Sequence, residues 1–202
     1  MVINVEIKMR TRSQTKNSAH IIIIRDRSGS MHSFEDRNPI KRIIETMAPD
    51  CPNAIVSVYS FNESVCDVIE EMPIKDVLSA DNLKRIYDAT EPDGLTALFK
   101  SVLRTKKLVL RKKDQMIVIS DGRNNVAPEL KTECMEYISS LKGRGIDVEF
   151  VGVNGLDIKE SCQAYGLEKI VLQRELKRGE VFQGLVMLGK AASQRSQGVS
   201  VM

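Results

Sequence analysis

Four consecutive isoleucines followed by an aspartate constrain the fold of this chain more than any other feature. Residues 21–24 are all β-branched, and such a run is typical of a strand buried on both faces of a parallel sheet. The strand ends near Asp26, and Gly29 then allows a sharp turn. Ligand sites of open α/β folds lie just beyond the carboxyl ends of such strands, so we expect a functional site in this turn.

The turn carries oxygen atoms at a regular spacing. Asp26, Ser28 and Ser30 follow one another at steps of two residues and supply one carboxylate and two neutral hydroxyls. A set made only of oxygens suits a small, hard divalent cation such as Mg²⁺. The pattern therefore predicts part of a coordination shell, which other segments of the chain have to complete.

Two distant residues supply further oxygens at comparable places. Thr96 lies in a glycine-containing loop that opens an amphipathic helix, and Asp121 ends a second apolar run at residues 116–120. Strand ends and helix starts of this kind meet at one edge of a parallel sheet. We therefore predict a metal site at that edge. The candidate metal ligands are Asp26, Ser28, Ser30, Thr96 and Asp121.

With these three elements the chain resembles the von Willebrand factor type A domain. In that family the metal-ion-dependent adhesion site is written Asp-x-Ser-x-Ser, then a distant Thr, then a distant Asp, and this chain has the same order. The resemblance covers roughly residues 18–192 and points to intracellular stand-alone domains of bacteria and phages. It implies Mg²⁺ (or Mn²⁺) bound directly by the three hydroxyls, with the two aspartates acting largely through bound water.

The resemblance also implies a function. An ion held mainly by neutral hydroxyls keeps much of its charge, and in the family an Asp or Glu of a partner protein enters its open coordination position. We therefore expect a metal-dependent protein-interaction module and not an enzyme. The alternative is a hydrolase that uses the same Mg²⁺ or Mn²⁺ ion to polarise a substrate. The sequence offers that alternative no nucleophile elbow and no paired acid and base.

Three arginines and one leucine depart from the family pattern or flank it. Arg25 replaces a residue that is usually apolar, Arg27 lies inside the first motif, and Arg123 follows the third. These guanidiniums either extend a positive rim that selects an acidic partner, or they point to solvent or pair with a nearby carboxylate, namely Glu35, Asp36 or Asp93. Leu95, where the family often has glycine, either contacts the partner or packs under its loop.

Composition is that of an ordinary globular domain. The 202 residues are 42% hydrophobic and 28% charged, which is ample material for one core. A net charge of +3 is too small to indicate nucleic acid or an anionic membrane as a partner. No apolar run reaches the ~18 residues of a membrane-spanning helix, and the N-terminus lacks a signal-peptide pattern. Four scattered cysteines indicate reduced thiols, so we expect a cytoplasmic protein.

Apolar runs and amphipathic stretches alternate along the chain, which predicts a doubly wound α/β fold with helices on both faces of the sheet. The sheet is expected to be mostly parallel, with one antiparallel edge strand from a hairpin of residues 54–61 and 65–71. We divide the chain into an N-terminal strand and polar lead-in (1–17), the domain (18–192) and a flexible C-terminal tail (193–202). The other expected elements are strands at residues 21–24, 116–120, 147–153 and 169–172, and helices at residues 35–47, 76–88, 96–110, 128–142, 157–165 and 179–193.

Two patterns suggest nucleotide or nucleic-acid binding and fail on closer reading. Residues 184–191 have the spacing of a P-loop, but they follow no strand and end in alanine where Mg²⁺ needs a hydroxyl. The basic residues between 104 and 113 fall at a helix end, where cations meet the negative pole of the helix dipole. No aromatic residue that could stack on a base lies among them, so this run does not indicate a nucleic-acid partner.

Overall fold

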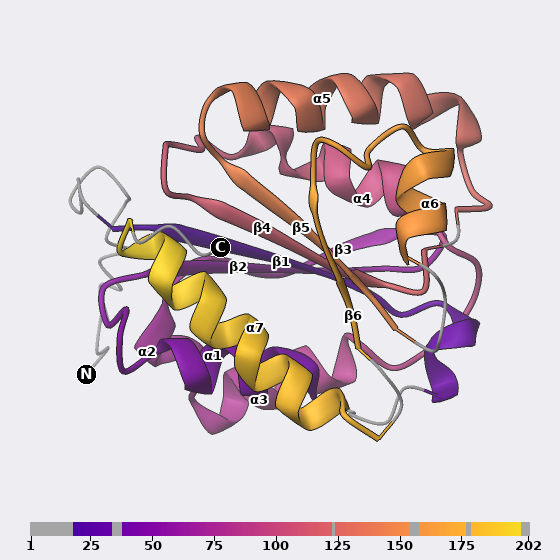
Figure 1. Ribbon diagram of the computed structural model, residues 1–202. Coiled ribbons are helices and arrows are strands. Elements are labelled where there is room, and N and C mark those ends of the chain that lie inside the picture. The colour runs from indigo at the N-terminus through magenta and orange to yellow at the C-terminus, as the bar shows by residue number, and fades with distance from the viewer. Residues whose placement is uncertain (1–17, 34–37, 123, 154–157, 177–178, 199–202) are drawn as a thin grey trace, which may run out of the picture.

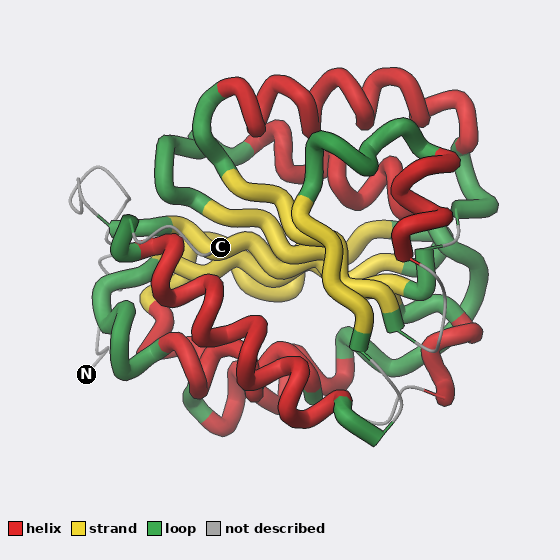
Figure 2. The backbone as a smooth tube through the Cα atoms, viewed as in Figure 1, coloured by secondary structure: helices red, strands yellow, loops and turns green. Residues whose placement is uncertain are grey.

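Two layers of helices enclose one twisted sheet (Figures 1 and 2). The computed structural model describes residues 18–33, 38–122, 124–153, 158–176 and 179–198. The expected N-terminal strand, Arg123, the expected helix starts at 35 and 157 and the last four residues lie outside these ranges.

The sheet confirms the predicted fold class. Its strands in the described residues are β1 (His20–Asp26), β2 (Ile55–Phe61), β3 (Val65–Pro73), β4 (Gln115–Ser120), β5 (Asp147–Gly152) and β6 (Leu172–Glu175). They lie in the order β3-β2-β1-β4-β5-β6. β3 pairs antiparallel with β2 at one edge, as the hairpin predicted, and the other pairs are parallel.

Helices cover both faces of the sheet, so β1 is buried along its whole length. The helices are α1 (Pro39–Met47), α2 (Ile74–Val77), α3 (Ala80–Asp88), α4 (Leu98–Arg104), α5 (Lys131–Gly143), α6 (Ile158–Ala164) and α7 (Val181–Ser196). In Figure 1, α4, α5 and α6 lie above the sheet, and α1, α2, α3 and α7 lie below it. Alternate isoleucines of β1 enter the two cores: Ile22 and Ile24 face the upper layer, Ile21 and Ile23 the lower one.

The strand order reverses at β1, which creates a crevice at its carboxyl end. The chain leaves β1 for β2 on one side and later returns to β4 on the other side. Open α/β sheets bind ligands at such a switch point, outside the carboxyl ends of the strands. Asp26 ends β1 and Asp121 follows β4, so the fold brings two predicted ligands to this crevice. A short 3-10 helix, η2 (Gly29–Ser33), lies beyond β1 at the lower right of Figure 1.

Several element boundaries differ from the expected ones. The helix expected at 76–88 is two helices, because Ser79 caps a new start: its hydroxyl accepts the Asn82 N–H at 3.4 Å. The helix expected to run to 110 ends earlier, with α4 followed by a 3-10 turn, η3 (Thr105–Lys107). Residues 128–130 form another 3-10 turn, η4 (Pro128–Leu130), before α5.

The last strand also lies later than predicted. It was expected at 169–172, but Ile170 and Val171 belong to a turn after α6, where their amides bond to the Leu167 carbonyl. The strand itself is polar. β6 lies at the edge of the sheet, where backbone hydrogen bonds to β5 hold it in place and its side chains are exposed or half-buried, so it needs no apolar run.

The polar residues 193–196, expected in the flexible tail, form the last turn of α7. The Arg195 guanidinium bonds to Glu149 of β5 at 2.5 Å and to the Gln115 side chain of β4 at 3.0 Å. Glu149 is 2% exposed and bonds to Arg174 of β6 at 2.7 Å. A buried carboxylate held by two guanidiniums therefore fastens α7 to the sheet. The proposed division into lead-in, domain and tail otherwise stays a prediction.

We predict that Arg195→Met lowers the free energy of unfolding by about 3 kcal/mol, because removing one partner of a buried ion pair leaves a charge poorly compensated. Equilibrium denaturation in urea measures this loss. Lys190→Met, an exposed lysine of the same helix, is the matched control and should change stability by less than about 0.5 kcal/mol. Equal losses in the two variants would show that the ion pair contributes nothing.

Candidate metal centre

The first predicted motif forms a compact set of oxygens at the end of β1. Asp26 is fully buried, and its Oδ1 accepts the Ser28 N–H at 2.8 Å across the turn. The hydroxyls of Ser28 and Ser30 lie 3.1 Å apart. The turn therefore brings all three side chains of the motif together, as the spacing predicted.

The loop that carries Thr96 is fastened to this turn by backbone bonds. The Gly29 N–H donates to the Gly94 carbonyl at 3.0 Å, and the Asp93 N–H donates to the Arg27 carbonyl at 2.6 Å. Gly94 has a φ of 72°, a left-handed conformation that glycine adopts without strain. Thr96 itself is 2% exposed and lies just before α4. The second ligand segment is thus held directly against the first.

The third segment begins at the last residue of β4 and is bonded to the end of β1. Ser120 Oγ donates to Asp26 Oδ2 at 2.7 Å and accepts the Gly122 N–H at 3.0 Å. Asp121, between them, is 4% exposed. The Tyr165 hydroxyl of the α6 region donates to the Gly122 carbonyl at 2.9 Å. These bonds fix the backbone on both sides of Asp121.

The electrostatics of the centre favour a cation. Burial is the main cause that raises the pKa of Asp26, and the negative charge of Asp121 raises it further. Hydrogen bonds from Ser120 and Ser28 oppose the rise without reversing it. The pKa of the Tyr165 hydroxyl is also raised, mainly by burial and then by Asp121. Two carboxylates that repel each other in a buried site are stabilised by a positive ion placed between them.

The donor set fits a hard, oxygen-seeking cation better than an ion that prefers thiolate or imidazole ligands. In the part of the chain that the structure describes, no three His, Cys, Asp or Glu side chains gather as a metal-binding group. The site instead combines two carboxylates with serine and threonine hydroxyls, which are ligands suited to Mg²⁺ or Mn²⁺. The five residues thus gather at one edge of the sheet, and their role as ligands stays a prediction.

Sequence reasoning missed two polar residues of the centre, Ser120 and Asn125. Asn125 Oδ1 accepts the Thr96 N–H at 2.7 Å, and the Asn125 N–H donates to the Thr96 carbonyl at 3.0 Å. The only sequence signal for Ser120 was a hydroxyl beside Asp121 at the end of a buried strand. Asn125 carried no signal, because asparagine in a loop is common.

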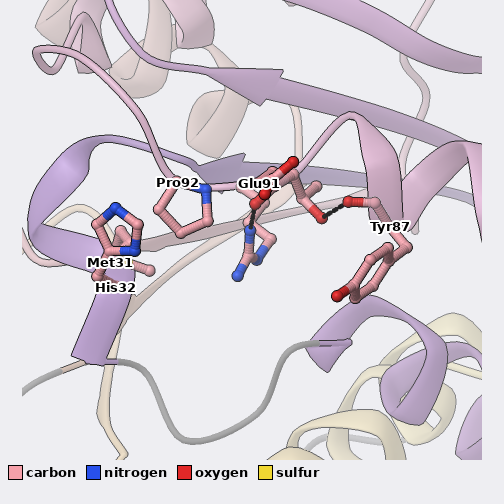
Figure 3. A pocket seen from close by; sticks show the side chains of 7 residues that line it. Met31, His32, Tyr87, Glu91 and Pro92 are labelled. Atoms are coloured by element: carbon pink, nitrogen blue, oxygen red, sulfur yellow. Dashed lines mark hydrogen bonds between the residues drawn. The ribbon is translucent and has the colours of Figure 1, made fainter.

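The interpretations of Arg25 as a solvent-facing or rim residue are wrong. Its side chain is 2% exposed and donates to the Thr90 carbonyl at 2.5 Å. Arg25 lines a pocket of about 180 Å³ together with Met31 and His32, and Figure 3 shows those two residues on the wall of this pocket. Arg25 lies on the buried face of β1 that also carries Ile21 and Ile23.

The other departures from the pattern differ in exposure. Arg27 is half-buried and donates to Asn62 Oδ1 at 3.2 Å, so it is partly engaged within the protein. Leu95 is 53% exposed, so it stands at the rim and does not pack under its loop. The Leu95 N–H donates to Glu63 Oε2 at 3.1 Å, which helps to hold the loop that presents this side chain.

Neither nucleotide-like pattern forms a site. The P-loop lookalike lies within α7, where Leu185 and Leu188 are buried in the core. Three of the basic residues near the end of α4 pair with acids, including Arg104 with Asp67 at 2.6 Å. That guanidinium holds the pKa of Asp67 at about 2, below its usual value. Carboxylates of the protein therefore already compensate much of this charge.

Two expectations drawn from composition concern the cysteines and the apolar character of the helices. All four cysteines are free thiols, and all but Cys66 are buried. Of the helices within the described ranges, none combines the length and the apolarity needed to cross a bilayer.

Comparison with solved structures identifies the fold. A von Willebrand factor type A protein from Catenulispora acidiphila has a TM-score of 0.65 at 14% identity, over 88% of this chain and 43% of that one. The manganese-loaded TRAP protein of Plasmodium vivax has a TM-score of 0.60 at 14% identity, over 88% and 74%. This chain has the von Willebrand factor type A fold.

A third similar structure carries a metal at the named motif. Proximal thread matrix protein 1 from the mussel byssus, with a zinc-occupied MIDAS motif, has a TM-score of 0.57 at 20% identity, over 87% of this chain and 46% of that one. This chain spans less than half the length of that protein and of the Catenulispora one. No family model and no curated protein matches the sequence. The likeness therefore establishes the type A fold.

Proposed function

We propose that this type A domain is a metal-dependent protein-interaction module. The observation that carries the proposal is the meeting of three oxygen-bearing segments around the buried Asp26 at the switch point of the sheet. The manganese-loaded and zinc-occupied relatives in fold support a divalent cation. The proposed ion is Mg²⁺ or Mn²⁺. Its proposed ligands are Asp26, Ser28, Ser30, Thr96 and Asp121.

The hydrogen bonds of Asp26 support an indirect role for this carboxylate. Each of its oxygens already accepts one protein donor, so two of its roughly four acceptor positions are used. The hydroxyls of Ser28, Ser30 and Thr96 then become the direct ligands, and Asp26 and Asp121 orient bound water. Neutral direct ligands leave the ion with most of its charge, which favours an anionic sixth ligand.

That ligand is an Asp or Glu side chain of a partner protein under this proposal. Leu95 is exposed next to Thr96 and offers the partner an apolar contact beside the ion. Neither a membrane nor a nucleic acid has a part in the proposal. Four free thiols are typical of a reducing compartment, which supports the cytoplasm as its location.

The first prediction concerns metal binding. Mg²⁺ or Mn²⁺ at one hundred times its dissociation constant should stabilise the domain by ~2.7 kcal/mol. For a domain of this size that is a rise of roughly 5–10 °C in melting temperature. Calorimetric titration and thermal melts should show binding heat and this rise in melting temperature in the native protein. Both signals should be absent in Asp121→Ala and Thr96→Ala.

Thr105→Ala is the matched control for the threonine variant. Thr105 is also buried, but its hydroxyl donates to the Val102 carbonyl at the C-terminal end of α4. This variant should keep the full metal-induced rise even if its metal-free stability falls. An equal rise in native protein, Asp121→Ala and Thr96→Ala would contradict the ligand assignment.

The second prediction concerns the partner's carboxylate. A random peptide library displayed on phage, bound to the full chain in Mn²⁺ and eluted with chelator, should be enriched for Asp or Glu at one position. Replacing that residue by Asn or Gln in the isolated peptide should weaken binding by more than ~30-fold, because a desolvated charge contact is worth 2–5 kcal/mol. Chelator-eluted peptides without an acidic residue would argue against carboxylate capture.

The third prediction is that the chain has no turnover. Near the candidate ligands the Tyr165 hydroxyl is committed to the Gly122 carbonyl, and His32 is exposed beside the separate pocket of Arg25. Generic phosphatase, nuclease and esterase substrates should therefore remain intact with Mg²⁺ or Mn²⁺. Activity that co-purifies with the protein and disappears in Ser28→Ala would favour the hydrolase alternative.

A further inference from the structure

The end of β4 and the loop after it bind both other candidate ligand segments through side chains that lie outside the metal motif. Ser120, the last residue of β4, reaches the end of β1, and Asn125, in the following loop, reaches the loop before α4. We infer that Ser120 and Asn125 are positioning residues that set the affinity of the metal site. This inference rests on the proposed function, since it concerns the geometry of the same site.

Ser120 connects the first ligand segment with the third. Its hydroxyl gives its single proton to Asp26 Oδ2 and accepts the N–H of Gly122, so both of its roles are occupied. Gly122 has a φ of 79°, and the bond to its amide holds the turn that carries Asp121. One hydroxyl therefore fixes the orientation of one carboxylate and the backbone of the other.

Asn125 connects the second segment with the third. Asn125 binds both backbone groups of Thr96. Its side-chain oxygen accepts the Thr96 N–H, and its backbone N–H donates to the Thr96 carbonyl. A second bond to the Thr96 carbonyl comes from the Val126 N–H at 3.1 Å. The neighbouring Asn124 Oδ1 accepts the Phe99 N–H in the first turn of α4. The backbone of Thr96 is thus placed by the loop that also carries Asp121.

Such placement matters for the ion because Mg²⁺ and Mn²⁺ tolerate little departure from octahedral geometry. Residues that orient metal ligands through hydrogen bonds typically contribute 10–100-fold to metal affinity. A purely structural role predicts something different: the substitution lowers stability equally with and without metal and leaves the affinity of the folded protein unchanged.

The test is a titration of the folded chain with Mn²⁺. Electron paramagnetic resonance measures the free Mn²⁺ at each step, and these values give the dissociation constant. Ser120→Ala and Asn125→Ala should each weaken Mn²⁺ binding by about 10–100-fold. Asn125→Ala also removes the acceptor of the buried Thr96 N–H, so its metal-free melting temperature should fall, and the deciding readout is the Mn²⁺ affinity of the protein that is still folded. Ser120→Thr and Asn125→Asp keep the hydroxyl and the acceptor oxygen and should restore most of the affinity.

Ser101→Ala is the matched control for Ser120→Ala. Ser101 is fully buried, and its hydroxyl donates to the Leu98 carbonyl within α4, away from the ligands. This variant should bind Mn²⁺ within about twofold of the native protein, whatever its stability.

The outcomes separate this inference from the proposed function. If the native protein binds no Mn²⁺, the proposed function fails. If the native protein binds Mn²⁺ and both alanine variants bind it within about twofold as tightly, the metal site stands and the inference is overturned. If only one alanine variant loses Mn²⁺ affinity and its conservative counterpart restores it, the positioning role belongs to that residue alone.

Discussion

The rest of the site depends on one constraint, a carboxylate buried at the end of the central strand. Asp26 is fully buried, and an ionised carboxylate in such a place requires donors and opposite charge. The turn after β1 supplies the Ser28 amide, and the last residue of β4 supplies the Ser120 hydroxyl. Two hydrogen bonds do not offset the burial, since the pKa of Asp26 remains raised. A bound cation supplies the missing compensation under the proposed function.

The fold could be predicted where local pattern and final environment agree. The four isoleucines of β1 are buried on both faces, as their run predicted, and the β2–β3 hairpin follows its two apolar runs. The prediction failed where partners lie far away in sequence. Arg195 looks like part of a polar tail until Glu149, 46 residues earlier, is seen beside it. The polar β6 likewise depends on backbone pairing with β5, which no periodicity reveals.

The candidate site divides in the same way. The five proposed ligands could be named from residue type and spacing, whereas Ser120 and Asn125 act on partners 94 and 29 residues away. The wrong prediction for Arg25 had a different cause, because the alternation of residues along β1 already indicated a buried position. Residues 21, 23 and 25 share one face of β1, and Arg25 lies opposite the buried Ser60 in the strand register. Alternation alone therefore placed that guanidinium under the helices.

Two neighbouring residues of one loop, Leu95 and Thr96, differ sharply in exposure, which under the proposed function separates metal binding from partner choice. Thr96 is 2% exposed and hydrogen-bonded at both backbone groups, while Leu95 is 53% exposed and its amide donates to Glu63. A substitution at position 95 changes what the rim presents and leaves the backbone bonds of Thr96 in place. Under the proposed function, the ion supplies a contact for any carboxylate, and discrimination between partners comes from side chains around it. Because Thr96 is buried and Leu95 is exposed, the rim is then free to vary while the metal geometry is kept.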